Sequence, residues 1–168
     1  MAIFLIPTSN LSYTTIMAFQ SITNQIKKVF WFFIQPIHPY LRDGLLALKV
    51  IHHNGRQPFV LGYLAPGKKA EDLRNFLITQ KYFEDHFPCW NDDGEVVDIR
   101  FCENFDWQYH LRVFNDGEIR GHHEYTPESR PIAHLKDKNS TAHTKEFLEF
   151  LEGWIETNND KSINITGL

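Results

Sequence analysis

The first long stretch of periodic hydrophobicity begins at Phe19. The apolar positions that recur there at helical spacing are Phe19, Ile22, Ile26, Val29, Phe30 and Phe33. This stripe predicts an amphipathic helix over residues 19–34. The helix is expected to end there because Pro36 and Pro39, which cannot continue it, follow directly.

The same helix also carries apolar residues away from the stripe, namely Trp31, Phe32 and Ile34. A helix that is apolar on every side is buried or meets another apolar surface. We favour a core helix packed under a sheet; a contact with a second copy of the chain, another protein or a membrane surface is the alternative. No transmembrane segment is expected, because the apolar run is far shorter than the roughly 20 residues that a span needs.

Two apolar runs flank Asn54-Gly55, a dipeptide that strongly favours a two-residue hairpin turn. Closure at this turn pairs Leu46 with Tyr63, Leu48 with Leu61 and Val50 with Phe59. One face of the two strands is then entirely apolar, so the register is self-consistent. The sequence therefore predicts a first β-hairpin over residues 46–63.

Helical spacing returns in residues 68–87, with Glu71 and Asp72 near the favourable N-terminal end, and in residues 143–156. Between them, residues 95–125 alternate apolar and polar positions in three short strands, followed by a polar loop over 126–140. The element order is α-ββ-α-βββ-α. Tight turns imply an antiparallel sheet of about five strands, and we expect an α+β fold with helices on one face.

The chain of 168 residues contains 42% hydrophobic residues, which fits one globular domain. We place this domain at residues 18–157, between an N-terminal extension of residues 1–17, for which disorder is an open alternative, and a frayed tail of residues 158–168. Met17 is an alternative start, because the periodic pattern begins directly after it.

Residues 107–125 give the most detailed prediction. Asn115-Asp116-Gly117 suits a three-residue loop with Gly117 in the left-handed conformation. This closure pairs Val113 with Ile119, Leu111 with Gly121, Tyr109 with His123 and Trp107 with Tyr125 on one apolar face. A two-residue closure would mix core and solvent positions, so we reject it.

The opposite face of this hairpin is polar: Gln108, His110 and Arg112 lie opposite Glu124, His122 and Arg120, and the preceding strand adds Asp98 and Arg100. We expect this face to be exposed, basic and rich in histidine. Arg112 directly opposite Arg120 is destabilising unless another group neutralises the pair.

Two registers of the strand at residues 95–102 remain open. If Cys102 pairs with Asp106, Asp98 lies beside His110 and His122, a set that resembles a two-His-one-carboxylate metal site. If Glu103 pairs with Trp107, Asp98 lies beside Arg112 and Arg120 and forms a row of salt bridges. We favour the second register, because it needs a left-handed Asp106 rather than a left-handed Phe105.

Composition narrows the possible partners. The formal charge of −4 and the pI near 6.1 argue against a binder of double-stranded nucleic acid, which needs a basic field over a whole face. No motif in the sequence indicates a cofactor. We interpret the two cysteines, Cys89 and Cys102, as free thiols, and we expect a cytoplasmic protein. An anionic small molecule or an acidic protein segment suits the polar face.

We therefore expect a small binding module. The candidate ligand-binding residues are Arg100, Gln108, His110, Arg112, Arg120, His122 and Glu124. The alternative is an enzyme with His110 or His122 as general base or metal ligand and with Arg112 and Arg120 binding a substrate anion. A weaker zinc hypothesis joins His86 and Cys89 to Cys102.

Overall fold

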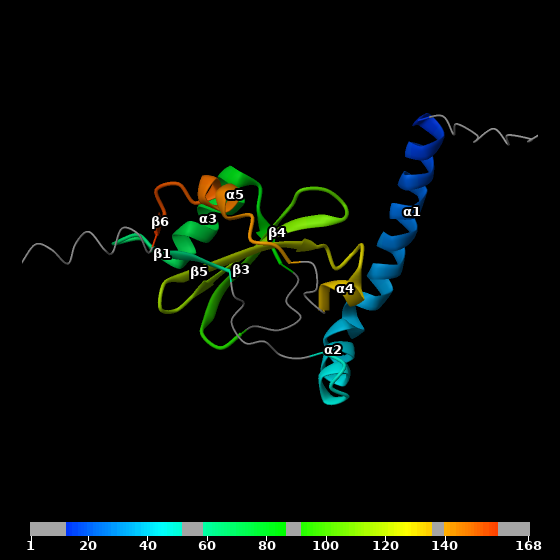
Figure 1. Cartoon of the computed structure of the whole chain (residues 1–168), viewed down its shortest axis with the longest axis horizontal. Helices are drawn as coiled ribbons and strands as arrows, with labels where there is room; N and C mark the ends of the chain where they lie inside the picture. Colours follow the sequence, from blue (N-terminus) through cyan, green and yellow to red (C-terminus); the bar gives the residue numbers. More distant parts are fainter. Residues whose placement is uncertain (1–12, 52–58, 87–91, 136–139, 158–168) are drawn as a thin grey trace, which may run out of the picture.

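The computed structural model describes residues 13–51, 59–86, 92–135 and 140–157 (Figure 1). The helical elements are α1 (Tyr13–Ile34), the 3-10 helix η1 (Gln35–Ile37), α2 (His38–Ala47), α3 (Ala70–Lys81), α4 (Pro131–Leu135) and α5 (Thr144–Phe150). The strands are β1 (Val60–Leu64), β2 (Glu84–Asp85), β3 (Glu95–Cys102), β4 (Trp107–Phe114), β5 (Glu118–Tyr125) and β6 (Ile155–Glu156).

The strands form a six-stranded antiparallel sheet in the order β2-β3-β4-β5-β1-β6. This confirms the predicted α+β class, with a sheet slightly larger than expected. Within the described ranges, no helix is both long and apolar enough to cross a membrane.

The central hairpin of β4 and β5 has the predicted register throughout. Val113 pairs with Ile119, Leu111 with Gly121, Tyr109 with His123 and Trp107 with Tyr125. Gly117 has a φ of 82°, the left-handed conformation that the three-residue loop requires. Alternation along both strands therefore divides their side chains between the two faces of the sheet as expected.

The apolar face of the sheet packs against α3 and α5, which lie on the same side of it in Figure 1. Leu111, Ile119, Leu73, Leu77 and Phe147 are all fully buried in this core. The contact is closest at Gly121, where an added Cβ would come within 2.7 Å of the Phe147 ring. Only glycine lets α5 approach β5 this closely.

The predicted first hairpin is wrong in its first strand. Residues up to Ala47 belong to α2, and Leu48 and Val50 are exposed in the turn that follows it. Asn54-Gly55 lies outside the described residues. The second run does form β1, but β1 has β5 on one side and β6 on the other, so no edge is left for residues 46–51.

Two helices are shorter than their periodic patterns. α3 ends at Lys81 because Tyr82 adopts a left-handed conformation with φ of 60°. α5 ends at Phe150, and Ile155–Glu156 forms the edge strand β6 instead of a last helical turn. The expected polar loop contains α4, a single turn of helix that begins at Pro131.

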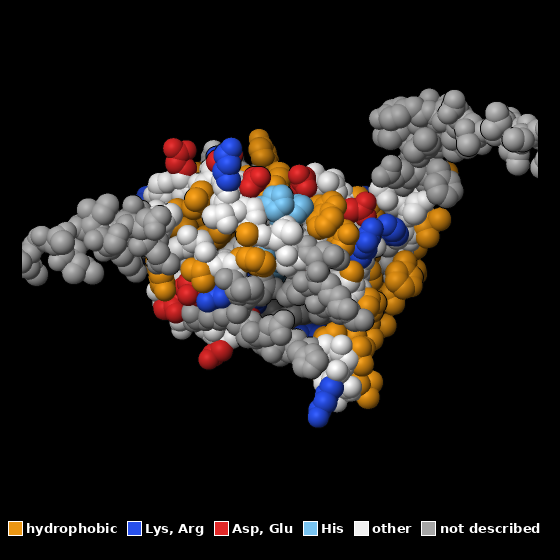
Figure 2. All heavy atoms as spheres, viewed as in Figure 1, with side chains coloured by type: hydrophobic (Ala, Val, Ile, Leu, Met, Phe, Trp, Pro, Cys, Tyr) orange, Lys and Arg blue, Asp and Glu red, His pale blue; other side chains and the backbone are white. Residues whose placement is uncertain are grey.

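α1 ends at Ile34 as predicted, but it is not a core helix. It projects along one side of the sheet body, and hydrophobic side chains line the edge that faces away from the sheet (Figures 1 and 2). Its exposed apolar residues include Ile22, Ile26, Val29, Phe30, Phe32 and Phe33. Trp31 is the buried exception among its described side chains, with its ring centroid 5.0 Å from that of His38.

Candidate functional site

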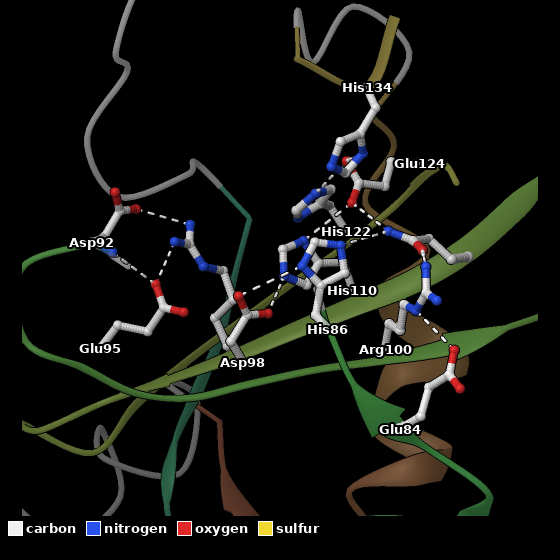
Figure 3. Close-up of polar contacts among 12 residues, drawn as sticks. Glu84, His86, Asp92, Glu95, Asp98, Arg100, His110, His122, Glu124 and His134 are labelled. Carbon is white, nitrogen blue, oxygen red and sulfur yellow. Dashed lines mark hydrogen bonds and ion pairs between the residues drawn. The ribbon is translucent and has the colours of Figure 1, made fainter. Parts of the chain in front are cut away.

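The polar face of β4 and β5 is buried, which corrects the expectation of an exposed basic surface. Gln108 is 0% exposed and His122 is 1% exposed, and His110, Arg112 and Glu124 are also buried. His86, directly after β2, and His134, from α4, lie over this face (Figure 3). Polar groups taken from water in this way need close partners.

The favoured register of β3 is confirmed, because Asp98 pairs with Arg112 and Cys102 with Gln108. The reason given for it is wrong: the described residues with left-handed φ do not include Asp106. Instead, the Asn104 side chain accepts hydrogen bonds from the backbone N–H groups of Asp106 and Trp107, at 2.8 and 3.0 Å. The reversal is therefore an Asx-type turn.

The carboxylate of Asp98 contacts histidines, although this register was expected to pair it with Arg112 and Arg120. Its Oδ1 lies 2.6 Å from Nε2 of His110, and its Oδ2 lies 3.6 Å from Nδ1 of His86. Residues diagonal to each other in an antiparallel pair are within reach of long side chains. The register that was expected to give a row of salt bridges therefore gives the contact between Asp98 and His110 that was expected from the other register.

The arginines find other carboxylates. Arg100 is held by Glu128 at 2.8 Å and Glu84 at 2.9 Å, and Arg112 is held by Asp92 at 2.8 Å and by Glu95. Arg120 pairs with Glu118. Because each of these guanidinium groups already faces a carboxylate, the polar face is not a basic surface, and its binding of an anion remains a prediction.

Glu124 is the centre of the buried cluster (Figure 3). Its Oε1 lies 3.1 Å from Nδ1 of His110, and its Oε2 lies 3.1 Å from Nε2 of His122 and 3.2 Å from Nδ1 of His134. The Gln108 amide donates a hydrogen bond of 2.9 Å to Oε1. Three imidazoles from β4, β5 and α4 therefore surround a single carboxylate on β5.

Burial and charge give the histidines different protonation states. Burial opposes a proton on His110, but Asp98 and Glu124 outweigh it and raise the pKa of His110 to about 10. Burial lowers the pKa of His86 to about 4, and the neighbouring His110 adds to this effect. At neutral pH these shifts make His110 an imidazolium and His86 a neutral ring.

Both carboxylates remain ionised despite their burial. Burial acts to raise the pKa of Asp98, but the charge and hydrogen bond of His110 hold it well below its ordinary value. Burial likewise acts to raise the pKa of Glu124, and the charges of His134 and His122 hold it low. The cluster thus keeps two negative charges inside the protein, and the imidazolium of His110 lies between them.

The donor atoms are close enough to share a metal ion. Three sets of residues each place their ligand atoms within 4.8 Å of one another: His110, His122 and Glu124; His86, Asp98 and His110; and His86, Glu124 and His134. Ligands at about 2.1 Å from one ion are themselves about 3.0 to 3.4 Å apart at octahedral or tetrahedral angles. The contacts of Glu124 with its imidazoles fall within this range.

Some of these residues could be found in the sequence and others could not. His110, His122 and Glu124 follow from the hairpin register, and His123 lies on the opposite face, as predicted from alternation, with its ring 3.0 Å from Glu103. His134 belongs to the polar loop over 126–140, which the sequence places beside this face, whereas His86 carries no local signal of its position. The zinc hypothesis joined His86 to Cys89 and Cys102. Cys89 lies outside the described residues, and Cys102 is exposed.

Comparisons of the chain with protein-family models, with curated proteins and with solved structures gave no match. The geometry of the cluster is therefore the basis on which its chemistry is judged. It offers imidazole nitrogens and carboxylate oxygens, the donor set that first-row transition metals use in proteins.

Proposed function

We propose that the protein binds one divalent transition-metal ion through Nδ1 of His110, Nε2 of His122 and the carboxylate of Glu124. One observation carries the proposal: these two nitrogens each lie 3.1 Å from a carboxylate oxygen of Glu124, close enough for an ion pair, but without the geometry of a hydrogen bond to it or to another described residue. Buried imidazole nitrogens without a hydrogen bond are rare. An ion between them and Glu124 would satisfy all three groups.

The surroundings of His110 support the same assignment. Metal-binding histidines usually donate their second ring N–H to a carboxylate, which fixes the tautomer and the ring orientation. Asp98 accepts this bond from Nε2 of His110 at 2.6 Å and so leaves Nδ1 for the ion. Compared with the metal set considered from the sequence, Glu124 replaces Asp98 as a ligand, and Asp98 becomes the outer group that orients His110.

Glu124, like His110, is oriented by a hydrogen bond with a residue that is not itself a proposed ligand. Gln108 donates to Glu124 through its amide nitrogen, and its amide oxygen accepts a bond of 3.2 Å from Arg100. Arg100 is fixed in turn by Glu128. This chain of hydrogen bonds orients the Gln108 amide, so that its nitrogen rather than its oxygen faces the carboxylate.

The small number of protein ligands favours a second candidate function. A two-His-one-carboxylate set leaves coordination positions that water or a small anion can occupy, and such sites support catalysis as well as binding. The anionic ligand expected from the sequence would then bind to the metal ion, and the arginines, which are already paired with carboxylates, would not be needed to hold it. His110 itself is a poor general base, because its raised pKa keeps it protonated at neutral pH.

Thermal unfolding of the metal-stripped protein tests the proposal. Added zinc should raise the unfolding midpoint by mass action, and excess chelator should reverse the rise. The matched variant Glu124→Gln keeps the size of the side chain and removes its charge, so its midpoint should not respond to zinc. A wild-type midpoint that is the same with and without zinc would contradict the proposal.

A further inference from the structure

The exposed apolar residues of α1 have the spacing of a coiled-coil seam. Ile22, Ile26, Val29 and Phe33 are separated by four, three and four residues, which is the a/d alternation of a heptad repeat. Their exposed fractions are 60%, 64%, 59% and 67%. Exposed Phe30 and Phe32 flank this seam, so it lies in a broad apolar face of the kind that meets another apolar surface.

The opposite side of α1 is attached to the protein's own fold. Trp31 is buried at 6% exposure, and Lys27 forms an ion pair of 3.5 Å with Asp106. Lys27 and Lys28 also place their ammonium groups 5.6 and 5.7 Å from the ring centroid of Phe105. These contacts hold the seam on the side that faces away from the sheet (Figure 2).

Charge decides which partner fits the seam. In residues 21–34 the charged residues are Lys27 and Lys28, which occupy the b and c positions of the heptad. The flanking e and g positions are Thr23, Gln25, Phe30 and Phe32. Two copies of this helix can therefore meet without opposing like charges.

A membrane surface fits less well. Helices that lie on membranes attract anionic lipids with free lysines and arginines. Here Lys27 is already paired with Asp106, and the chain carries a net charge of −4. We propose that α1 pairs with α1 of a second copy of this chain, with Ile22, Ile26, Val29 and Phe33 buried between the two helices.

The proposal is independent of the metal site, because the seam and the histidine cluster share no residue. Sedimentation of the full-length chain over a wide range of concentration tests it, with the variants Ile26→Asp and Ser21→Asp. Both substitutions add one negative charge to the same helix. Ile26 lies on the seam, whereas Ser21 occupies a c position away from it.

The expected result is a dimer for the wild type and for Ser21→Asp, and at least a hundredfold weaker association, on the order expected for an unpaired charge in an apolar contact, for Ile26→Asp. Because Ile26 is exposed, the change should leave the circular dichroism of the sheet domain intact. A wild-type monomer at every concentration would overturn the proposal. So would an Ile26→Asp dimer as stable as the wild type, or a monomeric wild type that sediments with phosphatidylglycerol vesicles.

Discussion

The carboxylate of Asp98 lies 2.6 Å from Nε2 of His110, although the backbone partner of Asp98 in the sheet is Arg112. This diagonal contact links two neighbouring strands through their side chains. It fixes the ring of His110, keeps a proton on Nε2 and turns Nδ1 toward Glu124. In the proposed metal site, Asp98 therefore orients the ligand His110 rather than binding the ion itself.

Replacing Asp98 with asparagine tests this orienting role. Asp98→Asn keeps the size of the side chain but removes the charge that fixes His110, so metal affinity should fall by about 10- to 100-fold. Competition with a chromophoric chelator measures the affinity. The matched control is Asp85→Asn, at an exposed residue of the adjacent strand β2 that pairs with Arg74. Equal affinities in the two variants would contradict the role of Asp98.

Metal affinity should depend on pH through His110. Since Asp98 and Glu124 raise the pKa of His110 to about 10, its Nδ1 proton must leave before the nitrogen can bind an ion. Below that pKa, His110 should contribute about a tenfold gain in apparent affinity per pH unit as the pH rises. Titration calorimetry in buffers of different ionisation enthalpy measures the released proton. An absence of proton release would show that His110 is not a ligand.

Arg112 should be important for stability. Its side chain is buried and faces the buried carboxylates of Asp92 and Glu95, so Arg112→Ala leaves two negative charges without this cation. The expected loss is about 3 to 5 kcal/mol of unfolding free energy, measured by urea denaturation. Arg74→Ala breaks the surface pair with Asp85 and should cost about 0 to 1 kcal/mol. Similar losses in both variants would contradict this difference in burial.

The packing of α5 on β5 depends on Gly121. An added Cβ would lie 2.7 Å from Phe147 and 2.9 Å from Leu61, so Gly121→Ala should cost about 1 to 3 kcal/mol through overpacking. Gly44 in α2 has no atom within 4 Å of such a Cβ, and Gly44→Ala should stabilise the helix by up to about 1 kcal/mol. Urea denaturation of both variants checks the two signs. A neutral Gly121→Ala would show that α5 can move away from the sheet.

Local pattern was sufficient for the central hairpin. Alternation in β4 and β5, together with a glycine at the only loop position that needs a left-handed backbone, defined every pair from Trp107–Tyr125 to Val113–Ile119. The same pattern identified His110, His122 and Glu124 as neighbours. Their burial was not predicted: His86, from a segment distant in the sequence, and His134, from the loop that follows β5, lie over this face (Figure 3).

Other errors arose where an apolar run fits more than one structure. Leu45 to Ile51 reads equally well as a strand and as the end of a helix, and tertiary pairing of β1 with β5 and β6 decided against the strand. The apolar circumference of α1 suggested burial, but local spacing cannot tell whether a helix meets its own sheet or another molecule. Only the positions of Trp31 and Lys27 show which side faces the fold.

The most direct test of the proposed function is the amount of Co²⁺ bound per chain after dialysis, compared between His122→Gln and His123→Gln. These residues are adjacent in β5, are both buried, and point to opposite faces of the sheet. We predict one ion per chain in the wild type and in His123→Gln, and loss of the ion in His122→Gln. A well-folded wild type without bound cobalt, or His122→Gln with full binding, would contradict the proposed metal site.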